Sequence, residues 1–160
     1  MNSRLVFKVI SLAGSTPFYL ATAVGLWFFQ SQIAYKLFFS FVALMLVCYG
    51  IKLFYRKPRP DAATHPAGSS WFGWLDAASF PSVHSSRAAA LAGCVFLLQP
   101  TTLVAVLGAC FVIAVGMARI KLRRHFLTDV IGGIIIGALV VILARKFTPP
   151  VVSIVQAWGR

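Results

Sequence analysis

The chain has 160 residues, of which 59% are hydrophobic and only 11% are charged, and its mean hydropathy is +0.86. Because a soluble domain carries about 25% charged residues, this composition excludes a soluble globular protein. It predicts one membrane-embedded domain over residues 1–160. Fifteen basic residues against three acidic ones give a net charge of +12. In so apolar a chain, that charge favours membrane lipids and a phosphorylated substrate as partners, and not nucleic acid.

The first thirty residues contain two apolar stretches separated by Gly14-Ser15-Thr16-Pro17. Ser15 or Thr16 can cap a helix that carries Pro17 in its first turn. We therefore expect an interfacial helix over residues 3–13 and a spanning segment over residues 17–30. One kinked helix over residues 5–29 is the alternative, because a span needs about 20 residues. We expect no cleaved signal peptide, since the first apolar run lacks a small-residue cleavage site.

Four further apolar segments follow, at residues 38–55 (beginning near Ile33), 81–98, 102–117 and 127–144. Residues 56–80 are rich in proline, glycine and tryptophan, which is typical of a loop at the membrane–water interface. Residues 147–160 are too short to be predicted as a spanning segment. Gly133 and Gly137 have the small-xxx-small spacing that lets helices pack closely. The three cysteines lie in apolar runs and are expected to be buried. The fold class predicted is all-α, a polytopic membrane bundle of about five to six helices with an interfacial N-terminal helix.

Counting the crossings between these segments places three stretches on one face of the membrane. They are residues 52–60, 81–84 and 119–129. The third stretch contains Asp129, the only acid within a spanning pattern, where an unpaired carboxylate is costly. If both residues lie on a helix, His125 shares a face with Asp129, which can then hydrogen-bond one ring nitrogen. The other nitrogen is left to act as a base or a nucleophile. A purely structural pair is the alternative.

The other two stretches supply groups that can bind an anion. Lys52 and Arg59 either snorkel at a helix end or reach together for one phosphate, to which Arg59 offers a fork of donors. The sequence Pro81-Ser82-Val83-His84 begins a helix, whose free N–H groups attract anions. His84 lies in the first turn and can protonate a leaving oxygen. For Arg87, one turn later, we consider a phosphate contact, a lipid-headgroup contact or snorkelling. His65 has no partners at a useful spacing and is predicted to be non-catalytic.

Taken together, these residues resemble a known signature. Lys52-x6-Arg59-Pro60, then Pro81-Ser82-Val83-His84, then Arg119-x5-His125-x3-Asp129 is similar to the three-part motif of the type 2 phosphatidic acid phosphatase superfamily. Two positions depart from it, because Val83 stands where that family usually has glycine and Ala118 where it usually has serine. The resemblance covers residues 52–129.

The resemblance implies a phosphoryl transfer that needs no metal and no cofactor. His125 would attack phosphorus and form a phosphohistidine, with Asp129 holding its ring, and His84 would protonate the leaving group. The phosphate oxygens would be held by Lys52, Arg59, Ser82, the Val83 amide and Arg119. With three acids in the chain, protein cations are the available substitute for a two-metal site.

The expected substrate is a lipid phosphate or pyrophosphate, such as polyprenyl pyrophosphate, phosphatidylglycerophosphate, phosphatidic acid or the phosphate of lipid A. A lipid phosphotransferase using the same site and a non-enzymatic transport or structural membrane protein are the alternatives. We expect a multi-pass protein of the plasma membrane (the inner membrane in bacteria). The resemblance implies an extracytoplasmic active site. The positive-inside rule implies the opposite, because more basic residues flank the predicted site than the other face.

Overall fold

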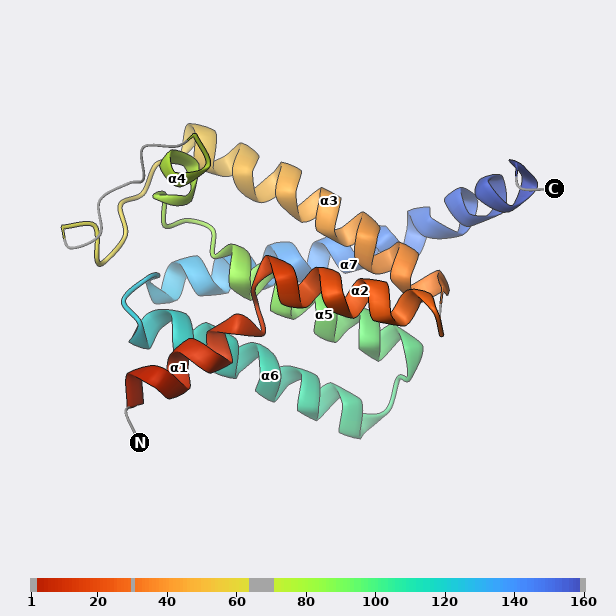
Figure 1. Cartoon of the computed structure of the whole chain (residues 1–160), viewed down its shortest axis with the longest axis horizontal. Coiled ribbons are helices and arrows are strands. Elements are labelled where there is room, and N and C mark those ends of the chain that lie inside the picture. Colours follow the sequence, from red (N-terminus) through yellow and green to blue (C-terminus); the bar gives the residue numbers. More distant parts are fainter. Residues whose placement is uncertain (1–2, 30, 64–70, 159–160) are drawn as a thin grey trace.

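The computed structural model describes residues 3–29, 31–63 and 71–158, and within these ranges the chain folds into helices without strands. The helices in chain order are α1 (Ser3–Leu12), α2 (Thr16–Trp27), α3 (Ser31–Phe54), α4 (Trp71–Asp76), α5 (Val83–Leu98), α6 (Thr102–Lys121) and α7 (Leu127–Trp158). The longer helices lie side by side as a bundle, and α7 extends beyond it toward the C-terminus (Figure 1). The predicted all-α bundle is confirmed.

Among the described residues, three helices are long and apolar enough to cross a membrane, over Gln32–Phe54, Thr102–Lys121 and Leu127–Phe147. The helices α1 and α2 meet at 44° and together qualify as a fourth, bent span. As the sequence predicted, the Ser15 side chain caps α2 by accepting a hydrogen bond from the Phe18 amide at 3.4 Å, and Pro17 lies in the first turn. The chain is therefore a membrane protein. Its last helix runs to Trp158, past the predicted end at residue 144.

The helix α5 is the core of the bundle and packs against α3, α6 and α7. It has 16 residues, and the side chains of its first two turns are almost all buried. Gly133 and Gly137 of α7 pack directly against the backbone at the start of α5. A Cβ added at Gly133 would lie 2.4 Å from the Ser82 carbonyl oxygen, and one at Gly137 would lie 2.3 Å from that of Ser86. Small residues at these two positions bring the start of α7 against the start of α5, as predicted.

The outer surface of the bundle carries large apolar side chains, such as Leu46 and Ile142, that are more than half exposed. Such a surface suits contact with lipid tails. Cys48 and Cys94 are buried, as expected, whereas Cys110 is exposed on α6, so the prediction for that cysteine is wrong. A cysteine behaves as a small apolar residue, and lipid accommodates it as readily as the protein core does.

All three predicted stretches lie at one end of the bundle. The end of α3, the short helix α4, the start of α5, and the connection from α6 to α7 come together there, at the left in Figure 1. The N-terminal helix α1 begins at the same end and packs against α6, while the C-terminus lies at the opposite end. Alternating helix directions therefore bring residues 52–60, 81–84 and 119–129 together.

Candidate active site

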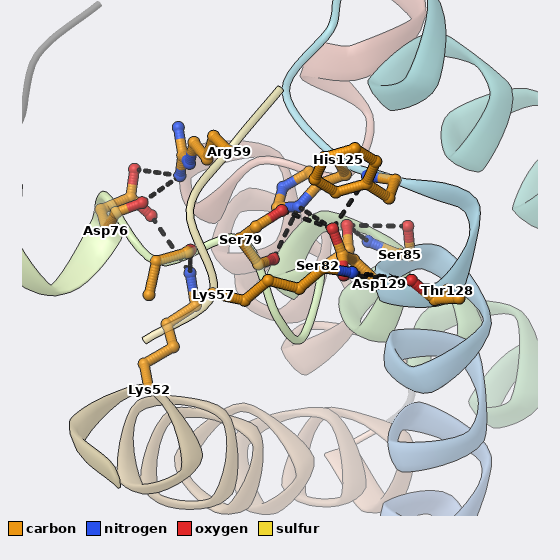
Figure 2. A network of polar contacts seen from close by, with 12 residues as sticks. Lys52, Lys57, Arg59, Asp76, Ser79, Ser82, Ser85, His125, Thr128 and Asp129 are labelled. Carbon is orange, nitrogen blue, oxygen red and sulfur yellow. Dashed lines mark hydrogen bonds and ion pairs between the residues drawn. The ribbon is translucent and has the colours of Figure 1, made fainter. Parts of the chain in front are cut away.

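Two basic residues converge on one acid at this end of the bundle. Lys52, in the last turn of α3, is fully buried, and its Nζ donates to the Ala78 carbonyl at 2.7 Å and lies 3.9 Å from Asp76 Oδ1. The Arg59 Nη2 lies 3.0 Å from Asp76 Oδ2 and also donates to the Asp76 carbonyl oxygen. Figure 2 shows Asp76 between these two cations. Lys52 points into the protein, so the snorkelling interpretation is wrong for it. Lys52 and Arg59 are therefore placed so that both can contact the same anion.

The start of α5 lies beside this pair and is fixed to α7. Ser82 is the N-cap, its Oγ accepting a hydrogen bond from the Ser85 amide at 3.4 Å and lying 2.9 Å from the Ser85 hydroxyl. The Ser82 amide donates to the Asp129 carbonyl at 2.9 Å. Val83 and His84 occupy the first two helical positions, whose N–H groups have no acceptor within the helix. The predicted anion-attracting helix start is therefore present, although the Ser82 hydroxyl is used for capping.

His125 is buried, with 2% of its side chain exposed, and its Nδ1 lies 2.8 Å from the Ser79 carbonyl oxygen. Because a carbonyl can only accept, Nδ1 carries the proton of a neutral ring and Nε2 keeps its lone pair. Burial, followed by the charges of Arg119, Arg59 and Lys52, lowers the pKa of His125 far below its ordinary value. The ring is therefore neutral at physiological pH, and Nε2 is available as a nucleophile or base.

The predicted hydrogen bond between Asp129 and the His125 ring is wrong, because Asp129 Oδ2 lies 4.0 Å from Nδ1. The Asp129 carboxylate instead accepts from Lys57 Nζ at 2.6 Å, from the Ser79 hydroxyl and from the Phe126 amide at 2.8 Å. The physical reason is that α7 begins at Leu127, so His125 precedes the helix and the spacing of i and i+4 has no meaning there. Asp129 is the third helical residue and caps the helix by bonding back to Phe126.

The carboxylate of Asp129 therefore acts on His125 through one intermediate residue. It binds the hydroxyl of Ser79, and the carbonyl of the same Ser79 holds the imidazole (Figure 2). Sequence reasoning missed both Ser79 and Lys57. A signal for Lys57 was available, because a fully buried carboxylate needs a cation and this lysine lies in the stretch predicted to share its face. Ser79 acts partly through its backbone, and side-chain identity gives no signal for that.

Arg119 lies in the last turn of α6, where 9% of it is exposed. Its Nη1 donates to the Ser11 hydroxyl at 2.9 Å, and its buried Nε has no partner among the described residues. His84 lies close enough to Arg119, Arg87 and His125 for their charges to act on it. Lys52, Arg59, His84, Arg119 and His125 thus form one electrostatic cluster.

Two further sequence predictions concern residues beside this cluster. Arg87 is 4% exposed, so it does not snorkel to the membrane surface. His65 lies outside the described residues. Within the described ranges, no three histidine, cysteine or acidic side chains lie close enough together to hold a metal ion. The positive charge around His125 comes from lysine and arginine.

Comparison with known proteins gives one consistent result. A model of the PAP2 superfamily matches residues 33–152, which include every residue of the cluster. Phosphatidylglycerophosphatase B of Bacillus subtilis (strain 168) is 31% identical over 121 residues, covering 65% of this chain and 56% of that protein. The chain thus spans a little over half the length of this curated relative.

Solved structures show the same fold. Aquifex aeolicus LpxE matches with a TM-score of 0.77 at 20% identity, over 90% of this chain and 86% of that one. The first transmembrane PAP2 type phosphatidylglycerolphosphate phosphatase from Bacillus subtilis matches with a TM-score of 0.69 at 24% identity, over 92% of this chain and 77% of that one.

Proposed function

The chain belongs to the PAP2 superfamily, and we propose that it is a membrane-embedded phosphohydrolase that removes phosphate from a lipid phosphate or lipid diphosphate, with residues 1–160 acting as one phosphatase domain. The observation that carries this proposal is the state of His125. Its Nδ1 is fixed at 2.8 Å from the Ser79 carbonyl, its ring is neutral, and Lys52, Arg59 and Arg119 lie around it. A neutral imidazole with one nitrogen held and the other free, among cations, suits attack on a phosphate group.

In the first step, the lone pair of His125 Nε2 forms a bond to phosphorus, and the bond from phosphorus to the leaving oxygen breaks. His84, which takes up a proton from the substrate phosphate when that group binds, gives this proton to the leaving oxygen, so the lipid leaves as an alcohol, or as a lipid monophosphate when the substrate is a diphosphate. The product on the protein is a phosphohistidine. Its lifetime depends on how fast water reaches it.

In the second step, the now neutral His84 takes a proton from water as the water oxygen attacks phosphorus. The bond between phosphorus and Nε2 breaks, inorganic phosphate leaves, and His125 returns to its neutral form. One water is consumed and one phosphate released for each lipid. Transfer to a second lipid in place of water would make the protein a phosphotransferase, so phosphate release without an acceptor lipid separates the two activities.

Charge on the transferring group is stabilised by groups that are already in place, which is the main source of catalysis in phosphoryl transfer. We assign this role to Lys52, Arg59, Arg119 and the start of α5 at Ser82 and Val83. Asp129 is a positioning residue that acts through Ser79. We propose that these cations replace metal ions.

We further propose that the protein lies in the plasma membrane, the inner membrane in bacteria, with the site on the extracytoplasmic face. The site occupies the end of the bundle, where a lipid headgroup would be found (Figure 1). A polyanionic substrate gives an independent reason for basic residues at this end, so they need not mark the cytoplasmic side.

Phosphate release from a panel of lipid phosphates in detergent tests the function. We expect hydrolysis that vanadate inhibits and EDTA does not. We expect His125→Ala to lower the rate by at least about a thousandfold, because it removes the nucleophile. His65→Ala, at a histidine that the sequence predicts to be non-catalytic, serves as the control with wild-type activity. Inhibition by EDTA but not by vanadate, or hydrolysis that survives His125→Ala, would contradict the proposal.

A further inference from the structure

Arg87 is a buried cation that the proposed reaction does not use. It lies on α5 with 4% of its surface exposed. Its Nη2 lies 3.8 Å from the Met45 sulfur, and its guanidinium carbon lies 5.7 Å from the centre of the Phe41 ring. Its Nε is buried without a hydrogen-bond partner among the described residues. The sulfur of methionine is only a weak acceptor, so these contacts satisfy little of its donor capacity.

The three acids of the chain are engaged elsewhere. Asp129 pairs with Lys57, Asp76 with Arg59 and Lys52, and Asp61 with Arg124. An arginine inside a membrane bundle without an anion is costly, and such residues usually mark the path or binding site of a substrate. A bound anion from outside the described chain would therefore stabilise the buried charge of Arg87.

The position of Arg87 relative to His84 indicates where that anion belongs. The two residues are three apart on α5, so they share a face, with Arg87 one turn further into the bundle. The charge of Arg87 acts on His84. Met45, which Arg87 contacts, precedes Lys52 by two turns of α3, a depth of about 10 Å. The cations proposed to bind the scissile phosphate lie at the end of the bundle. Arg87 lies deeper in the bundle than His84, on the side away from these cations.

We propose that Arg87 binds a second phosphate of the substrate, on the leaving-group side of the bond that is broken. This inference rests on the proposed function, in which His84 protonates the leaving oxygen. Whatever is bonded to that oxygen extends past His84 toward Arg87. In a lipid diphosphate it is the second phosphate itself, and in a phosphatidylglycerophosphate it is a glycerol followed by a phosphodiester. Phosphatidic acid and lipid monophosphates have no such group.

Two matched pairs of substrates test this assignment in detergent. One pair is a prenyl diphosphate and the monophosphate of the same prenol, and the other is phosphatidylglycerophosphate and phosphatidic acid with the same acyl chains. The readout is the ratio of kcat/KM within each pair. We expect the wild type to prefer the two-phosphate member of at least one pair. Arg87→Met should reduce that preference about tenfold or more, because it removes a charged donor to a phosphate. The pair that responds identifies the source of the second phosphate.

Two further variants and a measurement of the unfolding temperature distinguish a substrate-binding role of Arg87 from a structural one. Arg87→Lys, which keeps the charge, should recover part of the preference. Arg145→Met, which removes an exposed arginine a little past the middle of α7, should leave it unchanged. Arg87→Met should unfold at the same temperature as the wild type or higher, because it relieves an unmatched buried charge.

Three outcomes would count against the assignment. Equal losses of kcat/KM on both members of each pair, or an unchanged preference in Arg87→Met, would overturn it while leaving the proposed function intact. A lower unfolding temperature with the preference intact would show that Arg87 is structural. Wild-type protein that hydrolyses none of the four lipids would overturn the proposed function and this assignment together.

Discussion

At the scale of single residues, the nucleophile proposed here is held by a backbone carbonyl and not by a carboxylate. The Ser79 carbonyl fixes the tautomer of His125, and Asp129 and Lys57 fix Ser79 and the start of α7. This arrangement keeps the negative charge of Asp129 4.0 Å from the ring nitrogen, while Lys57 neutralises it at 2.6 Å. The imidazole therefore stays neutral without losing its orientation.

Asp76 is the residue whose removal most directly probes the phosphate-binding cations. Its carboxylate contacts Arg59 and Lys52, the two groups proposed to hold substrate phosphate, so it competes with phosphate for them. We expect Asp76→Asn to strengthen competitive inhibition by inorganic phosphate or vanadate by a few-fold up to about tenfold, since the acid is partly exposed and screened. Inhibition constants measured with one lipid phosphate check this.

Asp61→Asn is the matched control, because it makes the same change in net charge but removes the partner of Arg124. Its effect on phosphate inhibition should be smaller. Weaker inhibition of Asp76→Asn by phosphate would mean that Asp76 orients Arg59 for substrate and does not compete with it.

At the scale of helices, the site depends on the close approach of α7 to α5. A Cβ on Gly133 would lie 2.4 Å from the Ser82 carbonyl oxygen, a backbone atom that cannot move aside alone. We expect Gly133→Ala to push the two helix starts apart, lowering the unfolding temperature and reducing activity at least about tenfold through misplaced catalytic groups. Thermal unfolding and kcat in detergent measure both effects.

Gly50→Ala in α3 is the control for this change, because a Cβ there meets nothing within 4 Å. It should leave activity unchanged and stability equal or slightly higher, as alanine favours helix. Wild-type activity in Gly133→Ala would show that the contact does not position the site.

The helices could largely be predicted from sequence, and the contacts between motif residues could not. Apolar runs, the cap at Ser15 and the glycine spacing of α7 are local signals, and each was confirmed by the structure. The pairing of Asp129 with His125 was inferred from helical spacing, and it failed because His125 lies two residues before α7 begins. A difference of two residues at a helix start changes which groups face each other, and sequence patterns rarely fix that boundary.

At the scale of the whole molecule, three stretches separated by up to 77 positions in sequence, from Lys52 to Asp129, meet because helices alternate in direction. Counting crossings was enough to predict that they lie at one end of the bundle. It could not supply Lys57 or Ser79, whose contacts with Asp129 bridge 72 and 50 positions and depend on the path of the loop. The proposed catalytic and phosphate-binding roles of the clustered residues remain predictions.

The extracytoplasmic orientation proposed for the site can be tested by chemical labelling. Lys121 is exposed at the end of α6, on the same end of the bundle as the site. We expect a single cysteine at Lys121, in a chain whose native cysteines are replaced, to react with a membrane-impermeant maleimide added outside intact cells. A cysteine at Lys146, near the other end, should react only after the cells are opened. The reverse pattern would place the site in the cytoplasm.

The central claim is that His125 carries the phosphoryl group between lipid and water. The most direct measurement uses a lipid phosphate labelled with ³²P at the scissile phosphate, mixed with protein and quenched in alkali, which preserves phosphohistidine. We predict label on His125 in the wild type and none in His125→Ala. Hydrolysis without any labelled protein, or label on another residue, would contradict the account.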